Sequence, residues 1–150
     1  MKKNLLDKTT AAELMARANA LQADSKGKWG EMNVTEMLHH CNLTTAQVLD
    51  GDMECKPSTL KQRLLRILSL YVVPQFPKNL PGAARNDTKG KIDSGQFAVE
   101  KQRFLQLLDR FGNHKAPIAL THPAFGNLNT RQWGLAAWMH LDHHLRQFGV

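Results

Sequence analysis

Apolar residues recur every three or four positions over most of the chain, which is the period of amphipathic helices. The pattern predicts five helices, over residues 10–23, 33–51, 58–70, 95–111 and 129–148. Asn33 and Asn129 stand at two of the starts, and Glu36 and Gln132 follow them three residues later, the spacing of a capping box. Almost no segment alternates as a strand would, so we expect an all-α fold.

The segment 73–95 interrupts the helices, because it contains three prolines and three glycines (Pro74, Pro77 and Pro81; Gly82, Gly90 and Gly95). Ser94 is a candidate cap for the helix that follows. A connection of this length is either a mobile lid or a packed crossing segment, and the sequence leaves both open. With four long helices and one short one, we expect an antiparallel four-helix bundle with one extra short helix and a long proline-containing connection. At 150 residues we expect one domain, 1–150.

The formal charge of +7 raises the question of an anionic partner such as nucleic acid. Lysine and arginine are spread along the chain, and the densest cluster, at Lys56, Lys61, Arg63 and Arg66, alternates with leucines at helical spacing. A solvated helix face explains that cluster. The sequence contains no glycine-rich phosphate loop and no RNA-binding signature, so it gives little support to nucleic-acid binding.

No apolar run approaches the length of a membrane span, and only Leu5 and Leu6 follow the first lysines, so we expect neither a signal peptide nor a membrane partner. Cys41 and Cys55 have no metal-type spacing. We expect both to be reduced thiols in a cytoplasmic protein. Cys41 is either a nucleophile or, given its place among apolar positions, a packed thiol.

The last helix carries the most informative chemistry, because His140 and His144 lie one turn apart on its apolar face. A buried imidazole needs a hydrogen-bond partner or a metal. The spacing therefore leaves two interpretations open: a pair of metal ligands, or core histidines bonded to backbone or carboxylate groups. His143 falls at the edge of that face. Asp142 falls on the outer face, where we expect an exposed ion pair with Arg146.

The adjacent histidines of the second helix cannot face the same way. The apolar positions of that helix place His40 at their border and His39 nearly opposite, facing out. Together with His140 and His144, His40 would leave a zinc or nickel ion with open coordination positions, the pattern of a catalytic centre. A di-iron carboxylate site fits poorly, since only Glu36-Met-Leu-His39 has its spacing. His122 either lines the mouth of a pocket or is an ordinary turn histidine, and the sequence leaves both open. We expect His114 to be exposed.

Two segments carry a resemblance to a known family. Trp29 followed by Glu36-Met-Leu-His-His-Cys41, together with His140-x-x-x-His144-Leu-Arg-Gln147 near the C-terminus, resembles the DinB-like (YfiT-like) metalloenzyme superfamily, in an uncharacterised branch. The resemblance implies a four-helix bundle, often a homodimer, that binds a divalent metal through His40, His140 and His144. It also implies thiol-dependent transferase or isomerase activity with a low-molecular-weight thiol.

Two functions follow as hypotheses. The first is a metal-dependent transferase or hydrolase acting on an unidentified small molecule, since an open metal site can bind a thiolate or activate water. The second is a non-catalytic binding or dimerisation module whose histidines, or whose metal, are structural. The ending His144-Leu-Arg-Gln147 departs from the family's usual His-Arg-Gly-Gln. That departure weakens any inherited thiol specificity.

Overall fold

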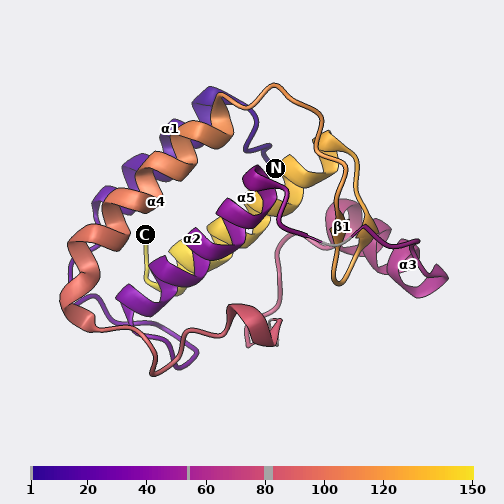
Figure 1. The fold of residues 1–150 in the computed structure, drawn as a ribbon. Coiled ribbons are helices and arrows are strands. Elements are labelled where there is room, and N and C mark those ends of the chain that lie inside the picture. Colours follow the sequence, from indigo (N-terminus) through magenta and orange to yellow (C-terminus); the bar gives the residue numbers. More distant parts are fainter. Residues whose placement is uncertain (1, 54, 80–82) are drawn as a thin grey trace.

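A computed structural model describes residues 2–53, 55–79 and 83–150 of the chain. Within these ranges the fold is mostly helical, with five α-helices and one two-stranded sheet (Figure 1). The helices agree with the expected all-α fold, and the small sheet was not expected. In chain order the elements are α1 (Lys8–Asn19), α2 (Val34–Asp50), α3 (Leu60–Ile67), the π-helical turn η1 (Leu68–Val72), the 3₁₀ turns η2 (Ala84–Asn86) and η3 (Ser94–Gln96), α4 (Phe97–Gly112), β1 (Thr121–His122), β2 (Gly126–Asn127) and α5 (Thr130–Gln147). None of the described helices is long and apolar enough to cross a membrane.

Helices α2 and α5, which carry most of the histidines, begin where the sequence predicts. Each start is fixed by a capping box, with Asn33 and Glu36 at α2 and Asn129 and Gln132 at α5. Helix α2 ends at Asp50, and the capping residue Gly51 has a left-handed backbone (φ +74°) that suits a glycine. These local signals set the length and the rotational phase of the two helices that face each other across the candidate site.

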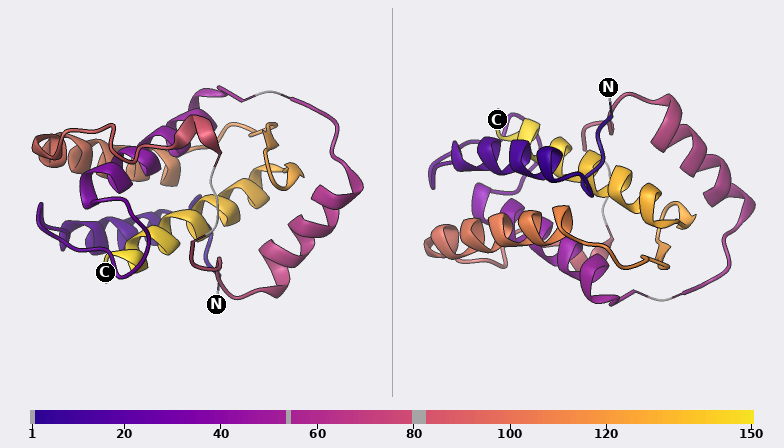
Figure 2. Two further views of the ribbon diagram at one scale, coloured as in Figure 1. Left: turned by 90° about the horizontal axis from the view of Figure 1, so that it is seen from below. Right: turned by 90° about the horizontal axis from the view of Figure 1, so that it is seen from above.

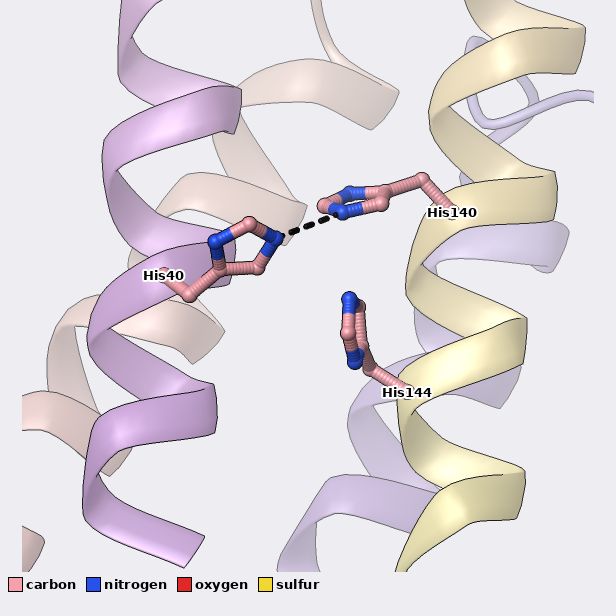
Figure 3. A group of neighbouring side chains, drawn as sticks. All are labelled: His40, His140 and His144. Atoms are coloured by element: carbon pink, nitrogen blue, oxygen red, sulfur yellow. Dashed lines mark hydrogen bonds between the residues drawn. The ribbon is translucent and has the colours of Figure 1, made fainter. Parts of the chain in front are cut away.

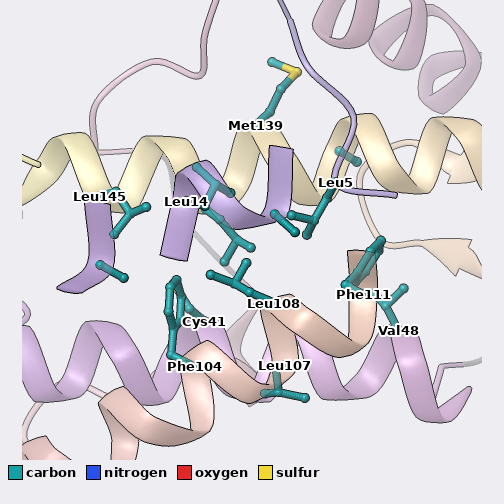
Figure 4. Close-up of a cluster of buried hydrophobic side chains, with 14 of the residues drawn as sticks. Leu5, Leu14, Cys41, Val48, Phe104, Leu107, Leu108, Phe111, Met139 and Leu145 are labelled. Atoms are coloured by element: carbon teal, nitrogen blue, oxygen red, sulfur yellow. The ribbon is translucent and has the colours of Figure 1, made fainter. Parts of the chain in front are cut away.

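Helices α1, α2, α4 and α5 enclose the core. Helix α4 packs on both α1 and α2, while α5 packs on α1 and α2. The core is one cluster of buried apolar side chains from all four helices and the N-terminal segment, among them Leu5, Leu14, Cys41, Phe104, Leu108, Phe111, Met139 and Leu145 (Figure 4). Gly134 lets the N-terminal segment lie directly on α5, where the Leu5 amide donates to the Gly134 carbonyl at 3.1 Å.

Helix α3 extends away from the other helices, and Figure 2 shows it apart from them in both views. No residue of α3 is buried, and Leu60 and Leu64 are 74% and 62% exposed. Polar side chains of α3 contact the hairpin region instead. The Gln62 amide donates to the Pro123 carbonyl at 3.0 Å, and Arg66 donates to the Asn127 carbonyl. The leucine pattern correctly predicted a helix, but the leucines lie outside the core.

Three expectations about local structure were wrong. The first helix ends at Asn19 rather than near residue 23, and the predicted third helix changes to a π-helical turn at Leu68. Before α4, the side chain of Asp93 rather than that of Ser94 accepts the capping hydrogen bond, from the Gly95 amide. The sequence also gave no sign of the hairpin β1–β2, whose strands are only two residues each. Within the connection 73–95, Pro81 and Gly82 lie outside the described residues.

Candidate metal centre

Three histidines from two helices converge at one point (Figure 3). His40 projects from α2, and His140 and His144 project from successive turns of α5. One ring nitrogen of each lies within 4.8 Å of the others, and the Nε2 atoms of His40 and His140 are 3.0 Å apart. The structure thus brings together the same three histidines that helical periodicity selected.

The partner of His40 decides which of its nitrogens is available. Its Nδ1 lies 2.7 Å from the backbone carbonyl oxygen of Asn86, in η2. A carbonyl oxygen only accepts hydrogen bonds, so Nδ1 carries the proton and donates it. In the neutral ring, Nε2 is then a lone-pair donor, and it points toward α5. Fixing a ligand's outer nitrogen on a backbone carbonyl is a common arrangement around protein metals.

His144 is oriented in the same way through a side-chain amide. Its Nδ1 lies 2.8 Å from Oε1 of Gln147, and the Nε2 of that amide donates to the Trp29 carbonyl at 2.7 Å. Because the Trp29 carbonyl requires a donor, the amide oxygen must face His144. The proton of His144 is therefore on Nδ1, and its Nε2 is bare. Gln147 is 3% exposed, so this chain of bonds is shielded from water.

Burial keeps these imidazoles neutral. It lowers the pKa of His144 to about 3, with the neighbouring His40 contributing in the same direction. Burial also lowers the pKa of His40, and it lowers that of His140 well below the ordinary value. A metal ion binds the neutral imidazole, and near neutral pH none of these three rings carries the extra proton of an imidazolium that would have to leave first.

The chemistry and the spacing of the cluster fit one divalent ion. Two nitrogens bound to one tetrahedral zinc at about 2.0–2.1 Å lie roughly 3.3 Å apart, close to the 3.0 Å between His40 and His140. No carboxylate or thiol of the described residues joins the three histidines. A bound ion would consequently have at least one position for a non-protein ligand.

The three histidines line a cleft of about 1080 Å³. Its wall is largely apolar and aromatic, with Trp29, Phe76, Phe125 and Trp133 among the lining residues. A cavity of this size accommodates a drug-sized small molecule. The open side of the candidate centre therefore faces a space that a ligand can enter.

His39 was predicted to face out, but it faces α4. Its Nδ1 lies 2.9 Å from Oε1 of Glu100 on α4, and the other carboxylate oxygen accepts from the Asn42 side chain at 2.7 Å. Glu36 is also engaged elsewhere, since its carboxylate caps α2 and accepts from the Gly90 amide at 2.6 Å. Neither residue belongs to the three-histidine cluster, so His39 has a structural role between α2 and α4.

Asp142 was also predicted wrongly. It binds Arg146 at 2.8 Å as expected, but it also binds Arg17 of α1 at 2.8 Å, and its side chain is only 14% exposed. It therefore connects α5 to α1 instead of lying on an outer face.

Cys41 is fully buried, and burial raises the pKa of its thiol, which supports the packed-thiol interpretation. Both cysteines are free thiols.

Of the remaining histidines, two line the cleft and His114 is not among its lining residues. His122 and His143 line the cleft, and the His143 ring lies 5.7 Å from that of Trp29. His114 packs near Phe111 and is half-buried rather than exposed. Sequence reasoning missed Gln147, although its place three residues after His144 on the same helix is a usable signal. It could not find the Asn86 carbonyl, because nothing in a sequence marks a backbone acceptor from a distant turn.

Comparison with protein families identifies the family of this chain. The model of a family described as "Protein of unknown function (DUF1569)" matches residues 1–149. No curated protein and no solved structure matches the chain. The expected membership of the DinB-like superfamily is therefore corrected to this family, and the thiol-dependent activity that the resemblance implied has no further basis.

Proposed function

Because the chain belongs to the DUF1569 family of proteins of unknown function, we propose its function from the candidate site: a metal-dependent hydrolase whose substrate is a small molecule. The observation that carries the proposal is the convergence of His40, His140 and His144 at the wall of the large cleft. Zinc and nickel are the favoured ions, since a set of three imidazoles suits both.

Each residue around the site has a part in the proposed chemistry. The three imidazoles hold the ion, and the Asn86 carbonyl and the Gln147 amide fix the rings of His40 and His144. The apolar cleft wall limits bulk water around the reacting groups. A divalent ion bound there would supply Lewis acidity and lower the pKa of a coordinated water to near 7.

We further propose that the scaffold is the antiparallel four-helix bundle expected from the sequence. The packing of α4 on α1 and α2, and of α5 on the same two helices, supports it. In such a bundle, sites are built from side chains that project inward from facing helices. His40 on α2 and the histidine pair on α5 fit this rule.

Metal content tests the first part of the proposal. Protein purified without a histidine tag should contain about one zinc or nickel per chain, and His140→Ala should lose most of it. The neighbours on α2 provide a matched pair. We expect His40→Ala to weaken binding strongly and His39→Ala to leave the metal affinity unchanged, because His39 contacts Glu100 instead. A folded wild type that holds no metal and takes up neither added ion would refute the site.

Ligand exchange tests whether the site is open. In cobalt-substituted protein, azide should change the visible spectrum, because it replaces a water molecule at an accessible coordination position. A spectrum that azide leaves unchanged, in protein shown to hold cobalt through the three histidines, would indicate a closed structural site. A hydrolase screen with ester, amide and phosphoester substrates then follows, with His140→Ala as the inactive reference.

A further inference from the structure

The hairpin β1–β2 holds His122 in a defined orientation in the cleft that the three histidines also line. His122 pairs with Gly126 across the hairpin, and its ring stacks on Phe125 with centroids 4.3 Å apart and planes inclined by 14°. The ring also lies 5.3 Å from that of Trp133, on the helix that carries His140 and His144. Contacts on two sides therefore fix the imidazole within the cleft wall.

The turn of the hairpin determines which nitrogen of His122 bears the proton. Nδ1 accepts hydrogen bonds from two backbone amides, those of Ala124 at 3.1 Å and Phe125 at 3.2 Å. A nitrogen that accepts has no proton, so in the neutral ring the proton is on Nε2. Nε2 has no hydrogen-bond partner among residues 2–53, 55–79 and 83–150, and the ring lines the cleft. His122 therefore offers an N–H donor to a ligand there.

This tautomer is the opposite of the one assigned to His40 and His144 in the three-histidine cluster. His40 and His144 donate from Nδ1, which leaves Nε2 bare for an ion, whereas His122 accepts at Nδ1 and keeps its proton on Nε2. To become a ligand through Nε2, His122 would have to move its proton to Nδ1 and lose both backbone hydrogen bonds there, or else become an anionic imidazolate. The same cleft thus contains two kinds of histidine, one suited to a metal and one suited to a hydrogen-bond acceptor.

We propose that His122 is a substrate-binding residue whose Nε2–H donates a hydrogen bond to an oxygen atom of the ligand at the three-histidine centre. The inference rests on the proposed metal function and adds a substrate class to it. The ligand carries a carbonyl, carboxylate or phosphoryl oxygen next to an apolar body, since the rest of the cleft wall is largely apolar. His122 is accordingly not a fourth metal ligand.

The first test uses the metal-free wild type and does not depend on any activity. Nitrogen-15 NMR of the imidazole side chains distinguishes the two tautomers and the charged form. We expect His122 in the Nε2–H form at pH 7. A His122 protonated at Nδ1 instead, or at both nitrogens, would overturn the inference.

The second test uses cobalt-substituted protein and two probes that bind metals differently. Acetate has a free oxygen that can accept from His122, whereas bound imidazole presents only an N–H outward. His122→Asn is the chosen variant, because an asparagine oxygen can also accept the backbone amides of a turn and so preserve the hairpin. We expect at least tenfold weaker acetate binding, with imidazole binding and cobalt affinity within threefold of wild type. His114→Asn, at a histidine that is not among the cleft-lining residues, is the control.

The outcomes separate the two proposals. A wild type that binds no cobalt refutes the metal centre and this inference with it. A wild type that binds cobalt, with acetate affinity unchanged in His122→Asn, refutes the role of His122 alone. If His122→Asn loses cobalt as completely as His140→Ala does, His122 is a metal ligand, and the inference is also wrong.

Discussion

Gln147 gives the sharpest test of how the residues around the candidate metal centre act. Its amide joins the Nδ1 of His144, at 2.8 Å, to the Trp29 carbonyl, at 2.7 Å. Gln147→Leu keeps the approximate size of the side chain but removes both hydrogen bonds. Because a lost outer partner of a metal-binding histidine usually costs 10- to 100-fold in metal affinity, we expect zinc to bind about 10- to 100-fold more weakly, or roughly 1.4–2.7 kcal/mol.

The same change should lower the stability of the metal-free protein. It leaves the His144 N–H and the Trp29 carbonyl without their partners, and a buried unpaired group costs about 1–3 kcal/mol. Gln147→Glu separates the two effects. Its carboxylate still accepts from His144, but it places a second acceptor against the Trp29 carbonyl. We expect this variant to be destabilised while its zinc affinity stays within a few-fold of wild type.

Zinc affinity is measured by competition with a chromophoric chelator, and stability by urea unfolding of the metal-free proteins. Gln102→Leu, at an exposed position of α4, is the control and should change neither quantity. A Gln147→Leu variant that is folded and binds zinc within twofold of wild type would refute the argument that this amide orients His144.

Two further predictions concern backbone geometry and pH. A Cβ on Gly30 would lie 2.5 Å from the Gln147 amide nitrogen, so Gly30→Ala should weaken zinc binding several-fold; Gly51→Ala, with a similar positive φ and open space around it, should leave zinc affinity unchanged in the same titration. Burial lowers the pKa of His122 to about 4, so the unfolded chain, with a histidine pKa near 6.5, takes up a proton that the folded chain does not. The stability that depends on neutral His122 should be fully present above about pH 6.5 and decline as the pH falls toward 4. The loss of unfolding free energy due to His122 should be about 2–3 kcal/mol at pH 4.5. Urea unfolding at pH 7 and at pH 4.5 should therefore show a smaller drop in unfolding free energy for His122→Phe than for wild type. An equal drop in both proteins would contradict the lowered pKa of His122.

The parts of the structure that the sequence predicted well depend on local interactions. The capping residues Asn33 and Asn129 lie within three residues of their partners, so the first residues of α2 and α5 could be predicted accurately. Once those helices were in phase, the turn of 100° per residue separated His40 from His39 and aligned His140 with His144. The convergence of the three histidines followed from this geometry.

The errors arose where distant segments decide the outcome. An apolar stripe predicts a helix but does not specify what covers the stripe, and the leucines of α3 illustrate this. His39 meets Glu100, and Asp142 meets Arg17, across more than sixty residues of sequence. The tautomer of His122 depends on a turn with two-residue strands, too short to give a periodic signal.

The reversed amphipathic orientation of α3 also has a consequence for local unfolding. The helix buries none of its side chains and is held to the hairpin mainly by polar contacts, so little apolar surface is lost when it opens. Its amide hydrogens should therefore exchange with solvent by a sub-global opening, at a free energy well below that of α2 and α5. Leu65 and Leu68 line the cleft. The same opening would change the width of the cleft while the helices that carry the three histidines remain folded.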